Sequence, residues 1–563
     1  MLYFDTLCKV AMLSAAIALT GCGGGGSSNL SDNNTGGTGG TGGTGGTGGT
    51  GGTGGTGGTG GTGAISTPVY TAGVYQPESE YKNFCSKPRS GIDPYTRKVY
   101  PDKAGSAEHE KMWLRSWSNR TYLWYNELPD IHPVGYGVVN YFNLLKTNAT
   151  TDSGVLKDQF HGARLTADYQ KETTSGVESG YGIHWQFGSA TPPRQLTVTF
   201  VEPASPAANA GVQRGDSVRF IDGVDFVNDG SQAGVNILNN ALFPVRTGQA
   251  HQFVFSRTTG ASVTANLVSA DVATTPVQNV KVLNNAGTKV GYLQFNSHIA
   301  IAQPQLIAAV ELFAQQNVSE LVVDLRYNGG GLLALASQLA YMVSGDTIIQ
   351  ERYFERTLFN DKYPNTDPVT GDALQPMPFF NLEIDYQQGR FTNNSLPSLL
   401  LNRVFVLTSE DTCSASEAFI NGLRGIDLEV IQIGGKTCGK PYGFYPTENC
   451  GNTYFTIQFS GINAKGFGDY ADGFTPRPAP VFAADVKGCP AQDDLTRPLG
   501  SPDEGMLSAA LYYANNNSCP PIAVAMQPQS ETLQHLSDGL AIKQPDKHQR
   551  QLLLNNKIIQ PIR

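Results

Sequence analysis

Leu321-Val-Val-Asp-Leu-Arg-Tyr-Asn-Gly-Gly-Gly-Leu332 predicts a short buried strand that runs into three glycines. A helix is expected directly after it, over residues 332–342. Upstream, the pattern predicts a strand over residues 289–295 and an amphipathic helix over residues 303–316. A strand, a helix and a strand in this order predict a β-α-β unit, and therefore an α/β core domain, which we place at residues 277–520.

The three glycines are compatible with two kinds of turn. Because glycine has no side chain, the backbone of residues 329–331 can approach another group closely, and its N–H groups can point at an anion. An ordinary strand-to-helix turn would have the same composition. This motif alone therefore does not decide between a structural turn and a binding loop.

A second strand-to-turn motif lies downstream. Residues 404–407 are apolar, and Thr412-Cys-Ser-Ala-Ser-Glu417 leads into a helix expected over residues 417–423. Ser414 therefore falls on a tight turn, which exposes a hydroxyl beside free backbone N–H groups. The same residues also describe a helix N-cap, with Ser414 as the cap and Glu417 closing a capping box. From this motif alone, the N-cap is the preferred interpretation.

Lys440 follows Ser414 by 440 − 414 = 26 residues, in Thr437-Cys-Gly-Lys-Pro441. A serine hydroxyl is a weak nucleophile, and a lysine can activate it only when burial or local charge depresses the lysine pKa. The pair makes the chain a candidate peptidase, with Ser416 as a competing nucleophile. Three histidines outside any motif are the alternative bases of a Ser-His esterase: His161, His184 and His298.

The two motifs together resemble those of the C-terminal processing peptidases, also called tail-specific proteases. That family has a D-L-R-x-N-x-G-G-L loop, a nucleophile in S-A-S-E and a lysine in G-K. The resemblance implies a crotonase/ClpP-like α/β peptidase core with Ser414 as nucleophile and Lys440 as base. It also implies that Gly330, Gly331 and the N–H of Ala415 form an oxyanion hole.

Two features depart from the family pattern. Phe444 stands where many members have a glutamine that orients the lysine amine, and Gln458 is a weak substitute for it. Cys413 directly precedes the serine, and Cys438 lies two residues before the lysine. Their symmetrical placement suggests a disulfide that ties the two catalytic turns together and limits drift of the Ser-Lys distance.

A second module precedes the core. A strand expected at residues 195–200 is followed by Ser205-Pro-Ala-Ala-Asn-Ala-Gly211, then by Arg214-Gly-Asp216 and Ile221-Asp-Gly223. This order resembles a PDZ domain over residues 176–272, and a generic small β-domain is the alternative. PDZ domains bind chain ends by adding the peptide as a strand. The resemblance implies a loop that holds the peptide carboxylate, formed by Gly180, Tyr181, Gly182 and Ile183.

The first 21 residues have the form of a lipoprotein signal peptide. Residues 10–19 are apolar, follow Lys9 and lead into Leu19-Thr-Gly-Cys22. The stretch is too short to span a bilayer and matches a signal-peptide h-region followed by a lipobox. We expect cleavage after residue 21 and lipidation of Cys22. The protein would then be anchored in a bacterial cell envelope, at the outer membrane facing the periplasm or at the cell surface.

Low-complexity sequence separates the lipobox from the folded region. Residues 22–68 are largely glycine pairs alternating with threonine, which predicts a flexible tether with an r.m.s. span of roughly 35 Å. Residues 69–168 follow as a helical cap region. Helices are expected in it over residues 109–128, 141–145 and 155–160, with the tryptophans of the first helix in the core.

Composition limits the classes of function. The net charge of −9 gives no basic footprint for nucleic acid. Without the leader and the tether, the remaining length is enough for two or three domains, and the hydrophobic content of 40% supports folded cores. The expected fold class is therefore α+β multidomain, with an N-terminal helical region, a PDZ-like β-domain, the peptidase core and a polar tail over residues 521–563.

Cysteine usage fits an exported protein. With Cys8 removed and Cys22 lipidated, six of the eight cysteines remain, and an even number favours up to three disulfides. A second pair, Cys489 with Cys519, is favoured more weakly. A zinc site is the alternative, but the spacings lack a C-x-x-C pair. No metal or other cofactor is expected.

The sequence therefore predicts a membrane-tethered serine endopeptidase. Its expected substrates are exported polypeptides with exposed C-terminal tails, and its expected contact with the membrane is a lipid anchor. The alternative is a non-catalytic PDZ lipoprotein that binds protein C-termini, which Phe444 favours. The oligomeric state is not predicted.

Overall fold

The computed structural model describes residues 66–244, 246–521 and 542. The predicted signal peptide, Cys22 and nearly all of the tether lie outside the described residues. The chain divides into the units 1–63 and 64–563, and all described residues belong to the second. None of the helices in the described part of the chain combines the length and apolar character needed to cross a bilayer.

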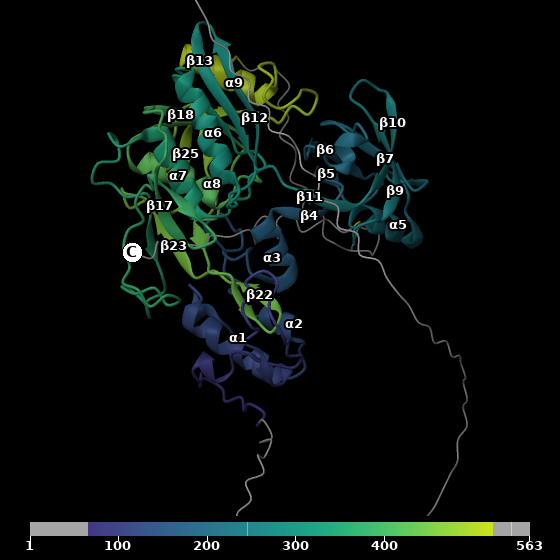
Figure 1. Cartoon of the computed structure of the whole chain (residues 1–563), viewed down its shortest axis with the longest axis vertical. Helices are drawn as coiled ribbons and strands as arrows, with labels where there is room; N and C mark the ends of the chain where they lie inside the picture. Colours follow the sequence, from purple (N-terminus) through teal and green to yellow (C-terminus); the bar gives the residue numbers. More distant parts are fainter. Residues whose placement is uncertain (1–65, 245, 522–541, 543–563) are drawn as a thin grey trace, which may run out of the picture. The chain divides into compact units, whose positions relative to one another are not determined.

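A seven-stranded sheet forms the centre of the C-terminal half (Figure 1). Only β12 and β13 pair antiparallel, and the remaining neighbours are parallel. In spatial order the strands are β12 (Val277–Asn285), β13 (Thr288–Phe295), β14 (Glu320–Asp324), β18 (Arg403–Thr408), β19 (Glu429–Gly434), β25 (Asp485–Pro490) and β24 (Thr475–Arg477).

Helices cover both faces of this sheet. Val323 and Val406 belong to one core with α6 (Ala302–Gln315), α7 (Leu333–Ser344) and α8 (Ala415–Gly425). Their neighbours Val322 and Phe405 belong to a second core with α9 (Gly505–Asn516). Because successive side chains of a strand point to opposite faces, a strand covered on both sides is apolar at nearly every position. This explains the continuous apolar runs in the sequence.

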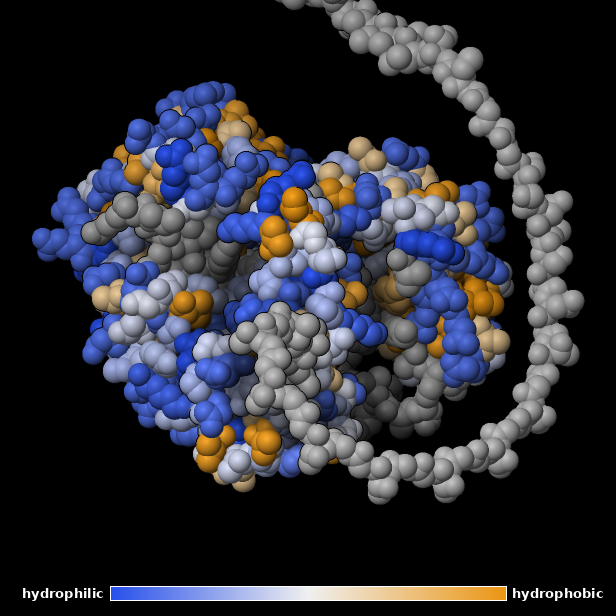
Figure 2. All heavy atoms as spheres, turned by 60° about the horizontal axis from the view of Figure 1, so that its bottom comes forward, coloured by the Kyte–Doolittle hydropathy of each residue, from blue (hydrophilic) through white to orange (hydrophobic). Residues whose placement is uncertain are grey.

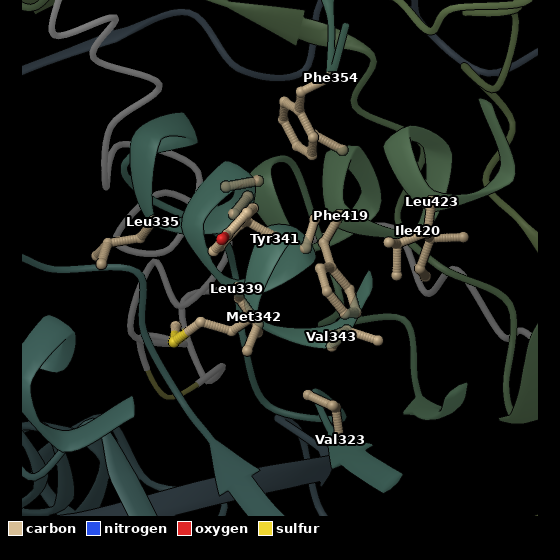
Figure 3. Packing of buried hydrophobic residues seen from close by; sticks show 14 of the residues in the cluster. Val323, Leu335, Leu339, Tyr341, Met342, Val343, Phe354, Phe419, Ile420 and Leu423 are labelled. Carbon is tan, nitrogen blue, oxygen red and sulfur yellow. The ribbon is translucent and has the colours of Figure 1, made fainter. Parts of the chain in front are cut away.

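The predicted β-α-β unit is present as β13, α6 and β14. Side chains of α7 and α8 pack against each other over the sheet, and Figure 3 shows Leu339 and Val343 near Phe419. This packing fixes the N-terminal ends of both helices. The two motifs singled out in the sequence, the glycine loop and the Ser414 turn, lie at these ends.

Residues 177–273 form a β-rich unit with its own core. Its ends are joined where β4 (Val177–Gly180) pairs with β11 (Ala270–Ala273), close to the predicted bounds of 176–272. Ile542 packs into this core, and its N–H donates to the Ala190 carbonyl at 3.2 Å. The main sheet contains β5 (Ile183–Ser189), β6 (Gln195–Val201), β7 (Ser217–Ile221), β8 (Val224–Asp225), β9 (Ala250–Ser256) and β10 (Ser262–Val268), with helices α4 (Pro206–Asn209) and α5 (Gln232–Leu242).

The region before this unit is less helical than predicted. Trp113 and Trp117 stack in a buried cluster, as expected. The helix predicted over residues 155–160 is wrong, because the Asp158 carboxylate accepts the Phe160 N–H at 2.9 Å and stabilises a local turn instead. The elements are η1 (Glu78–Glu80), β1 (Phe84–Cys85), β2 (Lys103–Ala104), α1 (Ala107–Thr121), η2 (Tyr125–Glu127), α2 (Val138–Phe142), β3 (Gly162–Leu165) and α3 (Thr166–Ser175).

The N-terminal region and the core share a sheet. β3 pairs with β22 (Asn452–Phe455), which pairs with β21 (Thr447–Asn449). The apolar pattern of the sequence predicts one strand over residues 454–459. The structure has two strands there instead, because the chain leaves β22 and enters a different sheet as β23 (Phe459–Ile462). The partners of β23 are β15 (Arg356–Leu358) and β20 (Tyr442–Gly443). The segment between α7 and β18, which includes β15, also contains the paired strands β16 (Leu382–Asp385) and β17 (Arg390–Ser395).

Three disulfides are present among the described residues. Two are the pairs favoured from the sequence, Cys413–Cys438 and Cys489–Cys519. The third, Cys85–Cys450, links the N-terminal region to the turn between β21 and β22. On the face drawn in Figure 2, hydrophobic atoms form small separate patches among hydrophilic ones, so this view of the described residues shows no broad apolar surface.

Candidate active site

Ser414 lies on a strained turn between β18 and α8. It is the N-cap of α8 and has φ 59° and ψ −115°, a left-handed φ that costs a residue with a side chain about 1–3 kcal/mol. Its side chain is almost completely buried, at 2% exposure. Its N–H donates to Glu417 Oε2 at 2.9 Å. Ser414 is thus both a helix cap and a residue held in the kind of strained turn where nucleophiles are found.

Glu417 connects the Ser414 turn to the Lys440 turn. Besides the Ser414 N–H, its carboxylate accepts the Lys440 N–H at 2.8 Å and the Gly439 N–H at 2.8 Å. The Thr437 hydroxyl donates to the same carboxylate at 2.6 Å. Burial raises the pKa of Glu417, and these hydrogen bonds oppose that shift. The sequence indicated only a capping role for Glu417, and no local signal in it pointed to the second turn.

The predicted Cys413–Cys438 disulfide reinforces this connection. It joins the residue before Ser414 to a residue two before Lys440, with a Cα–Cα distance of 5.2 Å. Cys413, Glu417 and Cys438 are close enough together to resemble a metal site. Both sulfurs are used in the disulfide, however, so this set does not fit a metal ion.

Lys440 is buried, at 1% exposure. Burial lowers the pKa of Lys440 to about 7, opposed by the charges of Asp158 and Glu417. A large fraction of the amine is therefore neutral near pH 7, as a general base requires. Its Nζ lies 4.5 Å from the centre of the Phe444 ring and 4.9 Å from that of Phe160. Phe444 is the residue that stands where a glutamine was expected.

Gln458 is occupied elsewhere. Its Oε1 accepts the Tyr445 N–H at 2.7 Å. Its Nε2 is buried without a hydrogen-bond partner among the described residues, and an amide N–H cannot accept a bond from an ammonium. The suggestion that Gln458 replaces the orienting glutamine is therefore not supported by its contacts.

The glycine loop lies directly against the nucleophile turn. Gly330 has φ 101°, and a Cβ built there would lie 2.7 Å from Ser414 Cβ. Gly331 has φ 137°, and its Cβ would lie 2.4 Å from the His298 carbonyl oxygen. Both positions therefore require glycine. The Ser416 hydroxyl donates to the Asn328 carbonyl at 3.0 Å, which gives Ser416 a role in holding this loop.

The predicted oxyanion donors differ in their availability. The Gly330 N–H already donates to Asn328 Oδ1 at 2.9 Å. The Gly331 N–H makes no hydrogen bond among the described residues. The Ala415 N–H belongs to the first turn of α8, where no acceptor within the helix exists. Gly331 and Ala415 are thus better placed to bind an oxyanion than Gly330.

A cavity of about 640 Å³ connects the glycine loop to the β-rich unit. Gly329 and Gly330 line one part of it, and the predicted carboxylate loop lines another. In that loop Gly182 has φ 74°, and a Cβ there would lie 2.3 Å from Ser205 Cβ, so glycine is required. The Tyr181 hydroxyl donates to the Ala241 carbonyl at 3.0 Å and fixes the loop.

Arg214, from the R-G-D motif, links the β-rich unit to the glycine loop. Its guanidinium donates to the Thr199 carbonyl at 2.9 Å and to the Tyr327 hydroxyl at 2.5 Å, and it pairs with Asp493. Tyr327 precedes the Asn328-Gly-Gly-Gly331 segment and stacks on Phe200, with ring centres 5.5 Å apart. A change in the β-rich unit could therefore reach the glycine loop.

The three histidines have other partners. His161 contacts Thr456 and the Phe142 carbonyl, His298 contacts Asn328, and His184 contacts Glu202. Burial lowers the pKa of His161 and of His298 to about 4, which makes both weak bases near neutral pH.

The chain matches known peptidases. Residues 289–449 match the model of peptidase family S41. A carboxyl-terminal-processing protease of Picosynechococcus is 29% identical over 270 residues, which cover 48% of this chain and 56% of that protein. The corresponding protease of Synechocystis is 25% identical over 272 residues, covering 48% of this chain and 54% of that protein. The chain thus spans about half the length of these relatives.

A solved structure agrees with the fold. A protein from Bacteroides fragilis assigned to the S41 proteases has a TM-score of 0.55 and 22% identity, covering 75% of this chain and 99% of that chain. The fold of the chain is thus similar to that of a known peptidase. Residues 289–449 are thus similar to peptidase family S41, and carboxyl-terminal-processing proteases are among the relatives of the chain.

Proposed function

We propose that this protein is a membrane-tethered serine endopeptidase that cleaves exported polypeptides with exposed C-terminal tails. One observation carries the proposal: the backbones of Ser414 and Lys440 bind the same buried oxygen of Glu417, beside a glycine loop in contact with Ser414. The lowered pKa of Lys440 supports its role as the base.

The proposed reaction uses three groups. Neutral Lys440 removes the proton of the Ser414 hydroxyl, and the serine oxygen attacks the scissile carbonyl. The N–H groups of Gly331 and Ala415 stabilise the negative oxygen of the tetrahedral intermediate. Protonated Lys440 then gives its proton to the leaving amine. In the second half, Lys440 removes a proton from water, which hydrolyses the acyl-enzyme and releases Ser414.

The β-rich unit would select the substrate in the manner of a PDZ domain. A polypeptide end would add along β5, and its carboxylate would bind at residues 180–183. The cavity lined by both this loop and Gly330 supports the idea, because Gly330 lies directly beside Ser414. Substrate choice would then depend on the exposed tail.

Anchoring is the second part of the proposal. Lipidation of Cys22 and the glycine-threonine tether would hold the peptidase at a bacterial envelope membrane while leaving it free to search the surface. Replacing Cys22 by Ser should move the protein from the membrane fraction to the soluble fraction. If the Cys22→Ser protein stayed in the membrane fraction, the lipid anchor would be wrong.

The catalytic proposal is tested with Ser414→Ala and Lys440→Ala in the chain without its first 65 residues. Each should reduce cleavage of an unfolded protein by at least about 10³-fold. Lys436→Ala removes an exposed lysine from the same turn and should remain active. A fluorophosphonate probe should label the parent and Lys436→Ala proteins at Ser414. Labelling of the Ser414→Ala protein, or undiminished cleavage by either site variant, would refute the mechanism.

The same experiment separates the alternative function. A non-catalytic tail-binding lipoprotein would bind a peptide with a free C-terminus but would neither cleave it nor react with the probe. Phe444 in place of glutamine was the feature that favoured this alternative. The contact of Phe444 with Lys440 offers a different explanation for the phenylalanine at this position.

A further inference from the structure

The amine of Lys440 lies near two aromatic rings that come from distant parts of the chain. Phe444 follows the lysine by four residues, and its ring centre is 4.5 Å from Nζ. Phe160 belongs to the segment before β3, and its ring centre is 4.9 Å from Nζ. Both side chains belong to a buried cluster with Tyr122, Phe455 and Ile457. The N-terminal region thus contributes directly to the surroundings of the proposed base.

Aromatic rings act on an amine differently from a glutamine. The face of a ring carries partial negative charge and attracts an ammonium, most strongly where water is excluded. A glutamine carbonyl fixes a lysine by one directed hydrogen bond, whereas two rings confine the amine and favour its charged form from the sides. Burial alone would disfavour that charged form. The rings therefore offset part of the cost of the ammonium that forms when Lys440 accepts a proton.

Asp158 fixes the position of Phe160. Its Oδ1 accepts the Phe160 N–H at 2.9 Å, and its Oδ2 accepts the Tyr122 hydroxyl at 2.7 Å. The Tyr122 oxygen in turn accepts the Thr147 N–H at 3.1 Å. Asp158 is fully buried, and its charge favours the ammonium form of Lys440. It therefore affects the lysine in two ways, through the position of Phe160 and through its charge.

We propose that Phe160 and Phe444, with Asp158 holding Phe160 in place, position the amine of Lys440 and take over the task of the absent glutamine. The inference rests on the proposed function, in which Lys440 activates Ser414. These three are positioning residues, because they act on the lysine and not on the substrate.

Other ionisable groups lie around Lys440 and affect its charge state. Glu417 contributes a charge that favours the ammonium, as Asp158 does. His161 lies 3.8 Å from Asp158, and because burial lowers the pKa of His161 to about 4 it stays neutral near pH 7. Glu417, Asp158 and His161 are present in every ring variant. The pH profile of a ring variant is therefore compared with that of a control variant that also keeps these three groups.

The test replaces each ring by an aliphatic side chain, Phe444→Leu and Phe160→Leu. The rate of Ser414 labelling by a fluorophosphonate is measured against pH. Without a ring the ammonium is less stable, so the acid limb should move to lower pH by roughly half a unit or more. The plateau rate should fall by about tenfold, because the amine is less well placed.

Phe455→Leu is the matched control. Phe455 is buried in the same cluster and packs on Phe444, with ring centres 5.4 Å apart, but its ring is not among those over Lys440. This variant should lose comparable thermal stability without moving the acid limb. Phe160→Tyr keeps the ring and should retain the parent profile. The proposal is overturned if both leucine variants keep the parent profile, or if Phe455→Leu moves it equally.

Asp158→Asn tests the third residue. The asparagine is nearly isosteric but removes the charge, so the acid limb should again move to lower pH. An unchanged profile would remove Asp158 from the proposal.

A second readout does not require catalysis. In protein labelled with ¹³C-lysine, the resonance absent from Lys440→Ala reports the pKa of Lys440 directly. This pKa should fall in Phe444→Leu and Phe160→Leu, and a pKa unchanged in both would contradict the positioning role. If the parent protein never reacts at Ser414, the proposed function fails, while this titration still decides whether the rings act on the lysine.

Discussion

The two sides of the candidate active site are held in different ways. On one side, the Ser414 and Lys440 turns are joined by the Cys413–Cys438 disulfide and by the buried Glu417 carboxylate. On the other side, no disulfide among the described residues holds the glycine loop, which is tied by hydrogen bonds. The Gly330 N–H donates to Asn328, the His298 N–H donates to the Gly330 carbonyl at 3.0 Å, and Tyr327 just before the loop contacts Arg214.

This difference suggests separate roles for the two sides of the site. We expect the proposed nucleophile Ser414 and the proposed base Lys440 to keep their relative positions when a substrate binds, because a disulfide and a buried carboxylate join their turns. The glycine loop is linked to the β-rich unit through Tyr327 and Arg214, so a movement of that unit can change the position of the loop. We therefore expect changes on the first side to slow the reaction at Ser414 itself, and changes at the link to the β-rich unit to alter mainly the use of polypeptide substrates.

The largest effect is expected where the two sides touch. In Gly330→Ala the new Cβ would lie 2.7 Å from Ser414 Cβ, at a φ of 101° that disfavours any side chain. The loop or the nucleophile must move, so kcat should fall by about 10³-fold or more. Gly287→Ala, at φ 91° with nothing within 4 Å of the new Cβ, controls for backbone strain. A Gly330→Ala enzyme within tenfold of the parent would show that the contact is unimportant.

A smaller loss is expected when the shared carboxylate is changed. Glu417→Gln keeps the shape but replaces one acceptor oxygen by an N–H₂, which faces donors from Ser414 or from the Lys440 turn. We expect labelling of Ser414 to slow by about 10²-fold and stability to fall by about 1–3 kcal/mol. Glu410→Gln, at an exposed position shortly before Ser414, should change neither quantity. Parent-like labelling of Glu417→Gln would mean that Glu417 is only a helix cap.

The disulfide should matter less for activity than Glu417, because the carboxylate still joins the turns when it is absent. The double variant Cys413→Ala/Cys438→Ala should lose about tenfold in kcat and about 2–4 kcal/mol in stability. Cys489→Ala/Cys519→Ala removes a bridge of similar sequence separation, 30 residues against 25, away from the site. It should lose similar stability without the loss of kcat. Equal activity in the two double variants would show that the Cys413–Cys438 disulfide does not help to position Ser414 and Lys440.

The smallest effect is expected at the link to the β-rich unit. Arg214→Met removes the bond to Tyr327 while keeping much of the side-chain volume. Cleavage of a protein with a free C-terminal tail should fall several-fold, and labelling by a small probe should fall less. Arg219→Met, at an exposed position of the same unit, is the control. An equal decrease with both substrates would indicate a general loss of stability.

Much of this architecture could be predicted because its signals are local. The apolar runs of β14 and β18, the glycines after β14 and the S-A-S-E turn mark elements whose neighbours in sequence are also neighbours in space. The Cys413–Cys438 pair followed from its placement beside the two turns, and the structure contains it.

The missed features depend on contacts between distant segments. Asp158 and Phe160 lie near Lys440 only because β3 pairs with β22, and a helix was predicted where the Asp158 carboxylate holds a turn. The second role of Glu417 likewise required the Lys440 turn to fold over α8. Asp158 accepts the hydroxyl of Tyr122, and Glu417 accepts N–H groups of the Lys440 turn. Both buried carboxylates thus bind groups that are distant in sequence, and no periodicity records such bonds.

Lys440, with its pKa lowered by burial to about 7, is proposed to activate Ser414. The rate of fluorophosphonate labelling at Ser414, measured against pH in the otherwise unchanged protein, tests this proposal most directly. A base must be neutral to act, so the rate should rise with pH through a single transition near pH 7 and should lose that transition in Lys440→Ala. A rate independent of pH across this range, or a transition that survives in Lys440→Ala, would contradict the account.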